Sequence, residues 1–279
     1  MALWYDETFE DHTRLGLRVK ETIFSEQSRF QKVEVIDTFG FGRVLVIDDV
    51  FMTSEYDEFL YHEMLAHPAL VTAPRIDRVL VIGGGDGGTV REVLRHPDVQ
   101  ECLMIEIDEL VVEASKRFLP GIGTAWDDPR LDLRFIDAIE YVTKSQDEKY
   151  DVILLDGTDP VGPGAVLFAE SFYQACKQML REDGVMALQS ESPLLMMDLF
   201  VEVQHKLRAL FAEVHPYLGP VPLYGTGTWS WTWCSDTGEP LRPIAERQEA
   251  IVAASKAYNA ELHQAMFALP NYVKRALKL

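Results

Sequence analysis

A glycine-rich segment, GGGDGG at residues 83–88, constrains the fold of this 279-residue chain more than any other part of it. It follows an apolar run over residues 79–82, which predicts a buried parallel strand, and it precedes a predicted helix over residues 89–96. Glycines between a strand and a helix let the backbone approach a ligand closely, and this context gives weight to the GxGxxG spacing. The segment therefore predicts a ligand-binding turn at the carboxyl end of a strand.

Strands and helices alternate along the rest of the chain, at the spacing typical of a doubly wound parallel sheet. Further strands are predicted over residues 103–105, 131–136, 152–155 and 184–188, with late strands near 214–218 and 228–235. Helices are predicted over residues 109–118, 138–144, 168–181 and 197–211. Ligands of such sheets bind beyond the carboxyl ends of the strands, so we seek functional residues directly after each strand.

The N-terminal part has the pattern of a β domain. Residues 32–37 alternate polar and apolar side chains, and residues 43–47 form a second apolar run after a glycine turn. Thr53 or Ser54 is expected to cap a helix from Glu55 to His67, which the next proline ends. We therefore expect an α/β protein in which a small β domain, residues 1–65, precedes a domain with a doubly wound parallel sheet, residues 66–279.

Charge is the unusual feature of the composition. The chain has 26 basic and 45 acidic residues, a net charge of −19. Such a balance argues against nucleic acid as a partner, because phosphate-backbone binding needs a basic face. It suits a cationic ligand, although solubility or a salt-adapted host would explain it equally well.

Three widely spaced cysteines, Cys102, Cys176 and Cys234, support neither a disulfide framework nor a zinc site, which favours a reducing, cytoplasmic compartment. The acidic N-terminus does not resemble a signal peptide. No uncharged run approaches the roughly 18 to 20 apolar residues of a membrane span, so we expect no membrane partner.

Carboxylates follow the first two predicted strands of the parallel sheet. Glu106 lies 23 residues after Gly83, where a carboxylate accepts hydrogen bonds from both ribose hydroxyls of a nucleoside. This pattern fits NAD and S-adenosyl ligands alike. Asp86 favours the latter, since a carboxylate repels a pyrophosphate and attracts a cation. A glycine turn needed only for tight packing is the structural alternative.

Further acids follow the third and fourth strands. Asp137 could accept from an adenine amino group, and it could equally cap a helix. Asp156 and Asp159 flank the start of a loop rich in glycine and proline, residues 156–164, which could form a lid over the ligand. An acidic surface turn is the alternative interpretation of this loop.

Two common catalytic patterns are not supported. His62 and His67 resemble a metalloprotease HExxH motif but stand one residue too far apart. Five residues turn the second histidine roughly 140° from the first, whereas the metalloprotease spacing turns it about 40°. We therefore expect no bound metal, and the absence of GxSxG removes support for a hydrolase triad.

Taken together, these motifs resemble the spermidine synthases, a family of polyamine aminopropyltransferases. The resemblance covers nearly the whole chain, and GGGDGG together with the DGTDPVGP segment at 156–163 is its most specific part. The other matching segments are Trp4, residues 28–31, 41–45, 56–64, 91–93, 106–108 and 167–168, Tyr224, and residues 229–230 and 267–270.

The resemblance implies a Rossmann-like, methyltransferase-type doubly wound sheet for residues 66–279, and it also implies an activity and its partners. Decarboxylated S-adenosylmethionine would donate an aminopropyl group as a co-substrate, with no separate cofactor. A diamine, commonly putrescine, would accept it, giving spermidine and 5′-methylthioadenosine. The family resemblance also implies a homodimer or homotetramer.

The resemblance also assigns residues, motif by motif. Asp156 would be the catalytic base. The donor-binding residues would be Gln31, Gly83, Gly85, Glu106, Asp137, Ala138 and Pro163. The amine-binding residues would be Tyr61, His62, Asp86, Asp159 and Tyr224.

Some positions depart from the family pattern. Ala138 replaces a usual glycine, Met52 stands where many members have glutamine, Asp49 where many have glycine, and Gly225 where proline is common. These differences bear on the choice of amine: cadaverine, agmatine or a longer polyamine stays open as acceptor.

The chemistry explains why several acids would gather at one site. A primary amine has a pKa of about 10.4 and needs a base before it can attack the sulfonium donor. We expect Asp156, oriented by Tyr61, to accept the proton, while Asp86 and Asp159 hold positive charge. An S-adenosylmethionine-dependent methyltransferase and a non-enzymatic polyamine- or nucleoside-binding protein are the alternatives, and an NAD dehydrogenase ranks after them.

Overall fold

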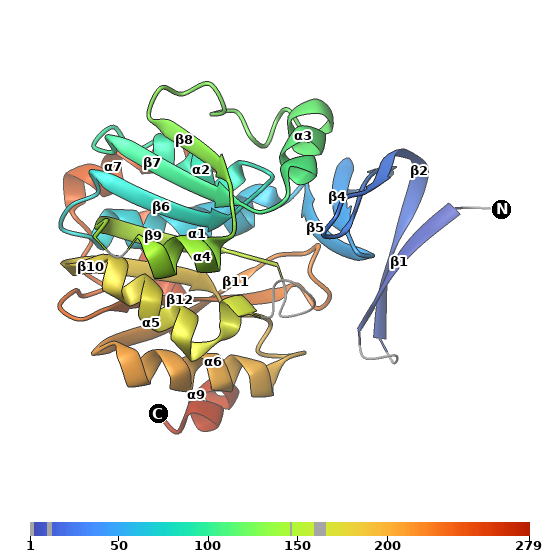
Figure 1. The fold of residues 1–279 in the computed structure, drawn as a ribbon. Coiled ribbons are helices and arrows are strands. Elements are labelled where there is room, and N and C mark those ends of the chain that lie inside the picture. The colour runs from blue at the N-terminus through green and yellow to red at the C-terminus, as the bar shows by residue number, and fades with distance from the viewer. Residues whose placement is uncertain (1–2, 10–12, 146, 159–165) are drawn as a thin grey trace.

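The computed structural model describes residues 3–9, 13–145, 147–158 and 166–279, and these residues form two sheets (Figure 1). The N-terminal sheet is an antiparallel meander with the strand order β1-β2-β3-β4-β5. Its strands are β1 (Leu3–Phe9), β2 (Thr13–Gln27), β3 (Lys32–Thr38), β4 (Arg43–Ile47) and β5 (Val50–Ser54).

The larger sheet has the strand order β11-β12-β10-β9-β6-β7-β8. Strands β10, β9, β6, β7 and β8 run parallel, while β12 pairs antiparallel with both β10 and β11 at one edge. The strands are β6 (Arg78–Gly83), β7 (Glu101–Glu106), β8 (Leu131–Phe135), β9 (Tyr150–Asp156), β10 (Leu180–Gln189), β11 (Glu213–Pro220) and β12 (Thr228–Ser235). The predicted α/β fold class is confirmed.

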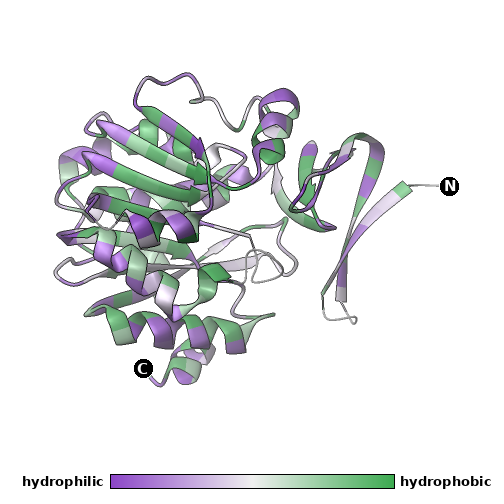
Figure 2. Ribbon diagram, in the orientation of Figure 1, coloured by the Kyte–Doolittle hydropathy of each residue, from purple (hydrophilic) through white to green (hydrophobic). Residues whose placement is uncertain are grey.

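Helices cover both faces of the larger sheet (Figure 1). They are α1 (Glu58–Thr72), α2 (Gly88–Leu94), α3 (Glu109–Phe118), α4 (Ala138–Lys144), α5 (Glu170–Met179), α6 (Met197–Leu210), α7 (Ala245–Val252), α8 (Ala260–Met266) and α9 (Asn271–Leu277). Alternate residues of β6 point to opposite faces: Val79 and Val81 pack with α1 and α2, and Leu80 and Ile82 with α4, α5 and α6. Figure 2 accordingly shows hydrophobic residues along the central strands between helices of mixed character.

The N-terminal sheet lies beside the end of the larger sheet where α3 begins (Figure 1). Val111 and Ala114 of α3 pack against Val33, Val35 and other buried side chains of β3 and β4. The N-terminal sheet ends at Ser54, and α1 packs on the larger sheet. The division into residues 1–65 and 66–279 stays a prediction.

The first helix differs from its prediction, and the difference has a physical reason. Helix α1 begins after Asp57 and continues through Pro68 to Thr72, whereas Ser54 belongs to β5. Proline cannot donate a hydrogen bond to the carbonyl four residues before it. That carbonyl, of Met64, instead accepts the hydroxyl of Tyr217 at 2.8 Å, so the helix tolerates Pro68 without leaving a buried acceptor unpaired.

Two further expectations can be compared with the structure. The three cysteines are free, consistent with the expectation of no disulfide framework, and the structure places all three in the interior. Within the described ranges, no helix is long and apolar enough to cross a membrane.

The turn after β6 depends on glycine at position 83. Gly83 has φ +81°, and a Cβ there would lie 2.2 Å from the carbonyl oxygen of Asp156. The same carbonyl accepts the N–H of Gly84 at 2.9 Å. The absence of a side chain therefore lets the ends of β6 and β9 touch.

We predict that Gly83→Ala lowers the free energy of unfolding by at least about 2 kcal/mol, because it combines left-handed strain with a backbone clash. Urea unfolding followed by circular dichroism measures this change. Gly121→Ala is the matched control, since a Cβ at Gly121 meets nothing within 4 Å. Equal stability of the two variants would contradict the role given to Gly83.

Candidate active site

A deep cleft opens between the two sheets, at the carboxyl ends of the parallel strands. Its larger part is a cavity of about 360 Å³. A second cavity of about 260 Å³ shares Met52, Tyr61, Gly157, Thr158 and Tyr224 with the first, so the two cavities adjoin at these residues.

The sequence-predicted site residues that the structure describes all line the larger cavity. They are Gln31, Tyr61, His62, Gly83, Gly85, Asp86, Glu106, Asp137, Ala138, Asp156 and Tyr224. Asp159 and Pro163 lie outside the described residues, as does the rest of residues 159–164 of the loop that could form a lid, 156–164. The individual roles of these residues stay predictions.

Asp156 ends β9 with its carboxylate held from two sides. Tyr61 on α1 donates its hydroxyl to Oδ1 at 2.8 Å, and Thr89 on α2 donates to Oδ2 at 2.6 Å. Burial and the nearby Asp86 carboxylate raise the pKa of Asp156 above its ordinary value, against the two hydroxyl donors. Asp156 is therefore a fixed carboxylate with an increased affinity for a proton.

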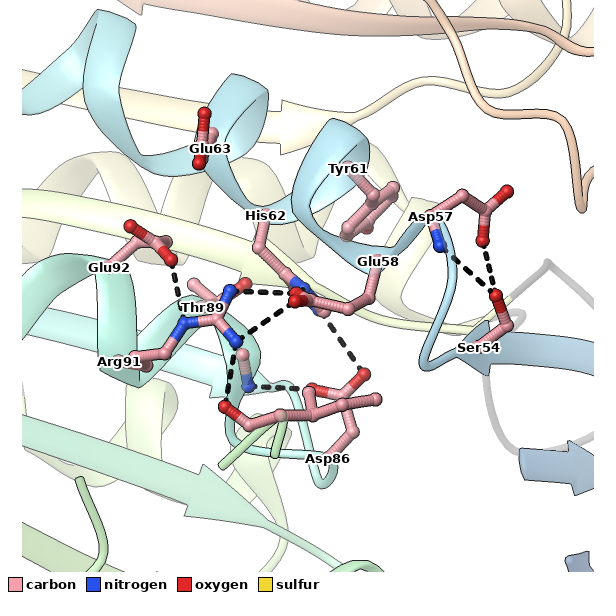
Figure 3. A network of polar contacts seen from close by, with 12 residues as sticks. Ser54, Asp57, Glu58, Tyr61, His62, Glu63, Asp86, Thr89, Arg91 and Glu92 are labelled. Atoms are coloured by element: carbon pink, nitrogen blue, oxygen red, sulfur yellow. Dashed lines mark hydrogen bonds and ion pairs between the residues drawn. The ribbon is translucent and has the colours of Figure 1, made fainter. Parts of the chain in front are cut away.

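Asp86 lies in the glycine turn and has the opposite character. Its Oδ1 accepts the N–H of Gly88 at 2.8 Å, and its Oδ2 lies 3.2 Å from Nε2 of His62 (Figure 3). Burial alone would raise the pKa of Asp86, but His62 outweighs that effect and the pKa lies below its usual range. Asp86 therefore stays ionised although its side chain is only 11% exposed.

Glu106 ends β7 and is buried, with 9% of its surface exposed. Its Oε1 accepts the backbone N–H groups of Ile107 and Asp108 at 2.7 and 2.9 Å. Burial raises the pKa of Glu106 to about 7 despite these two bonds. Because Oε2 lies beside Gly85 at the cavity wall, this oxygen is placed to accept hydrogen bonds from a ligand.

Asp137 caps α4, the alternative that its sequence position left open. Its carboxylate accepts from the backbone of Ile139 at 2.7 Å and of Glu140 at 3.3 Å, and the residue also lines the cavity. The capping role occupies Oδ1.

Aromatic side chains form the wall between the two cavities. The rings of Tyr61 and Tyr224 lie 5.8 Å apart in an edge-on arrangement. The Tyr224 hydroxyl donates to the backbone carbonyl of Met52 in the N-terminal sheet. Gln31 reaches the cavity from the same sheet, and the hydroxyl of Ser28 beside it donates to Asp108 at 2.7 Å. Both sheets therefore build the cleft.

Sequence reasoning missed several residues of this region. Thr89 lies in the first turn of α2, and its bond to Asp156 has no signal in the sequence. Gln189 ends β10, Glu191 follows it, and both line the smaller cavity, so the strand-end rule that found Glu106 would have found them as well.

The two histidines of α1 point into different surroundings. His62 lies between Glu58 and Asp86, whereas His67 contacts His96 at 3.2 Å. The described residues hold no group of three or more potential metal ligands.

Two family models match the chain in consecutive segments. The spermidine synthase tetramerisation domain matches residues 3–55, and the spermine/spermidine synthase domain matches residues 58–242. Curated relatives are similar over their full length. A polyamine aminopropyltransferase of Alkaliphilus metalliredigens is 39% identical, over 100% of this chain and 99% of the relative. One of Thermoanaerobacter sp. (strain X514) is 41% identical, over 98% of each.

Solved structures agree with the sequence relatives. A spermidine synthase in complex with the transition-state analogue AdoDATO is 38% identical and superimposes with a TM-score of 0.95, covering 99% of this chain and 95% of the other. The spermidine synthase of Thermotoga maritima is also 38% identical, with a TM-score of 0.93 and coverage of 99% and 94%.

The raised pKa of Glu106 predicts a pH-dependent penalty on folding. Its pKa is higher in the folded than in the unfolded chain, so the free energy of unfolding falls as the pH rises from about 4.5 through about 7. Glu106→Gln should remove about 3 kcal/mol of this fall. Urea unfolding of both proteins at pH 5 and pH 8 measures the difference.

Glu109→Gln, an exposed change in the first turn of α3, is the control and should leave the pH dependence unchanged. The same pH dependence in Glu106→Gln and in the unsubstituted protein would contradict the placement of Glu106.

Proposed function

Because the chain belongs to the spermine/spermidine synthase family, we propose that it transfers the aminopropyl group of decarboxylated S-adenosylmethionine to putrescine. The products would be spermidine and 5′-methylthioadenosine. The chain is a polyamine aminopropyltransferase, and the identity of donor and acceptor is the proposed part.

One observation carries the proposal: three carboxylates, one buried and two partly buried, converge on a single cleft. Asp86, Glu106 and Asp156 all line the larger cavity, and all three are at the carboxyl ends of parallel strands or in the turn that follows. A sulfonium donor and a protonated diamine would repel each other in such a space. Fixed negative charge in a low-dielectric cleft offsets that repulsion.

The proposed mechanism assigns proton removal to Asp156. The donor's leaving group departs as a neutral thioether and needs no acid, whereas the amine must lose a proton before its nitrogen attacks. The raised pKa of Asp156 makes it a stronger base than an ordinary aspartate. Tyr61 and Thr89 fix both of its oxygens, so an amine could be held in line with the carbon–sulfur bond.

Asp86 would bind the acceptor amine, and Glu106 would bind the ribose of the donor. Asp86 stays ionised beside His62 and is placed to hold the amine end of a substrate. Glu106 would accept from the ribose hydroxyls of the donor through Oε2. The transition-state analogue bound by a solved relative supports transfer chemistry for this fold.

The smaller cavity bears on the acceptor. It continues from Tyr61 and Tyr224 toward Glu7 and Glu191, both buried carboxylates. A diamine reaching from Asp156 into this space would place its second ammonium near negative charge. We propose putrescine as the main acceptor. Cadaverine, agmatine and longer polyamines are the alternative acceptors.

Assembly and location complete the proposal. The match of residues 3–55 to a tetramerisation domain supports a homo-oligomer, either a homodimer or a homotetramer, formed through the N-terminal sheet. We further propose that the protein acts in the cytoplasm and needs no cofactor besides its co-substrate.

A product panel tests the reaction. The protein is mixed with decarboxylated or ordinary S-adenosylmethionine and with putrescine, cadaverine, agmatine or spermidine, and products are identified by mass spectrometry. We expect spermidine from putrescine with the decarboxylated donor, formed faster than any other product. Methylated products would instead indicate a methyltransferase, and binding without product would indicate a binding protein.

Removal of the proposed base tests the mechanism. Asp156→Asn should lower kcat by about 10²- to 10⁴-fold, the range typical of general-base removal. Asp151→Asn is the matched control, because Asp151 is buried near the other end of the same strand and accepts from the backbone of Arg78. It should lose stability but keep turnover. Near-normal kcat in Asp156→Asn would overturn the assignment.

A further inference from the structure

A buried charged network runs behind the cleft and connects α1 to α2 (Figure 3). Glu58 of α1 and Arg91 of α2 are 4% and 8% exposed, and neither lines the cavities. Arg91 donates to both oxygens of Glu58, at 3.1 Å and 2.7 Å. Two parallel bonds of this kind fix a carboxylate in one orientation.

His62 connects this pair to the cleft. Its Nδ1 lies 2.8 Å from Oε2 of Glu58, one helical turn earlier, and its Nε2 lies 3.2 Å from Oδ2 of Asp86. An ionised carboxylate only accepts hydrogen bonds, so two such bonds require a proton on each ring nitrogen. The geometry therefore describes an imidazolium between two carboxylates.

Packing leaves His62 little freedom to turn. The side chain is 2% exposed, and a Cβ added to Gly88 would lie 2.2 Å from the imidazole ring. The ring of Tyr61 contacts it edge-on at 5.4 Å between centroids. The imidazole is thus held on one side by Glu58 and on another by the glycine turn.

The charges around His62 come from each element packed against it. The acidic groups are Glu58 on α1, Asp86 in the glycine turn, Glu92 on α2 and Asp156 on β9, and Tyr61 on α1 is a further titratable group. The basic groups are Arg91 on α2 and Lys256 after α7, whose Nζ lies 3.9 Å from Oε1 of Glu58. Arg91 also donates to Glu92 at 2.7 Å, and Glu92 in turn accepts from Arg95. Acidic and basic side chains therefore alternate through this network.

We propose that Glu58 and Arg91 are positioning residues that act through His62: they hold its Nε2–H toward Asp86 and so fix the charged oxygen that Asp86 presents to the substrate amine. This proposal rests on the proposed function, because it assigns an amine to Asp86. It makes Glu58 and Arg91 part of substrate recognition although neither touches the cleft.

Electrostatics gives the proposal a second consequence. Burial would lower the pKa of His62, but Asp86 and Glu58 outweigh it and raise that pKa well above its ordinary value. The imidazolium in turn lowers the pKa of Asp156, against the effects of burial and Asp86. Loss of the Glu58 carboxylate would favour neutral His62, and the pKa of Asp156 would then rise further.

Glu58→Gln tests the proposal with a change of nearly equal volume. We expect kcat/KM for putrescine to fall about tenfold, within the range measured for contacting charged groups. The affinity for 5′-methylthioadenosine, measured calorimetrically, should change less than twofold. The acidic limb of the kcat/KM profile should move to higher pH, since a larger share of Asp156 is protonated at each pH.

Glu63→Gln is the matched control on the same helix. Glu63, like Glu58, is a buried glutamate of α1, but its carboxylate accepts the backbone N–H groups of residues 256–258. This variant should lose stability without changing the pH profile or the kinetic constants for putrescine. A double-mutant cycle with His62→Gln adds a further requirement: Glu58→Gln should have little additional effect in that background.

Two results would overturn the proposal. One is a Glu58→Gln variant that loses stability but keeps the pH profile and kcat/KM for putrescine, as a purely structural link between α1 and α2 would. The other is a full additional effect of Glu58→Gln in the His62→Gln background.

A measurement without substrate separates this proposal from the proposed function. In protein labelled with ¹⁵N-histidine, the NMR signals of His62 at pH 8 should be those of imidazolium, and those of neutral imidazole in Glu58→Gln. If the unsubstituted protein shows this pattern yet forms no aminopropylated amine, the proposed function fails while the link from Glu58 to His62 stands. Neutral His62 in the unsubstituted protein would overturn the link itself.

Discussion

Two partly buried aspartates that face one cleft impose the constraint on which the rest of the site depends. Asp86 follows β6 and Asp156 ends the neighbouring strand β9, so the topology places two like charges close together in a low-dielectric space. The surroundings separate their pKa values: His62 lowers that of Asp86, and burial with Asp86 raises that of Asp156. One carboxylate is therefore suited to hold a cation and the other to take a proton.

The N-terminal sheet gives this pair its enclosed environment. The Tyr224 hydroxyl donates to the backbone carbonyl of Met52, and the Ser28 hydroxyl donates to the carboxylate of Asp108. These two hydrogen bonds connect the N-terminal part of the chain to the part that forms the larger sheet. Asp156 and Glu106 line the cavity beside residues of this sheet, and burial is the largest cause of the raised pKa of each. Among the acidic residues that the structure describes, Asp86, Glu106, Asp137 and Asp156 line the larger cavity, a small part of the 45 acids behind the net charge of −19.

The sequence predicted the parallel sheet and the strand-end carboxylates well, because buried strands and glycine turns have strong local patterns. The helices at 109–118 and 138–144 have the predicted bounds. Continuation of α1 through Pro68 was not predictable, because the Met64 carbonyl that Pro68 leaves without a helical donor is paired by the hydroxyl of Tyr217, a residue distant in sequence. The hydrogen bond from Thr89 to Asp156 and the contact of Arg91 with His62 through Glu58 were missed for the same reason, because both join segments that are distant in sequence.

The opposed pKa values of Asp86 and Asp156 are the central claim, and carbon-13 NMR of carboxyl-labelled aspartates tests them most directly. The two signals are assigned with Asp86→Asn and Asp156→Asn and followed from pH 2 to pH 9. The structure predicts that Asp156 titrates above the ordinary aspartate value of about 3.9 and Asp86 below it. Titration of both at the ordinary value, or in the reverse order, would contradict the division of roles between them.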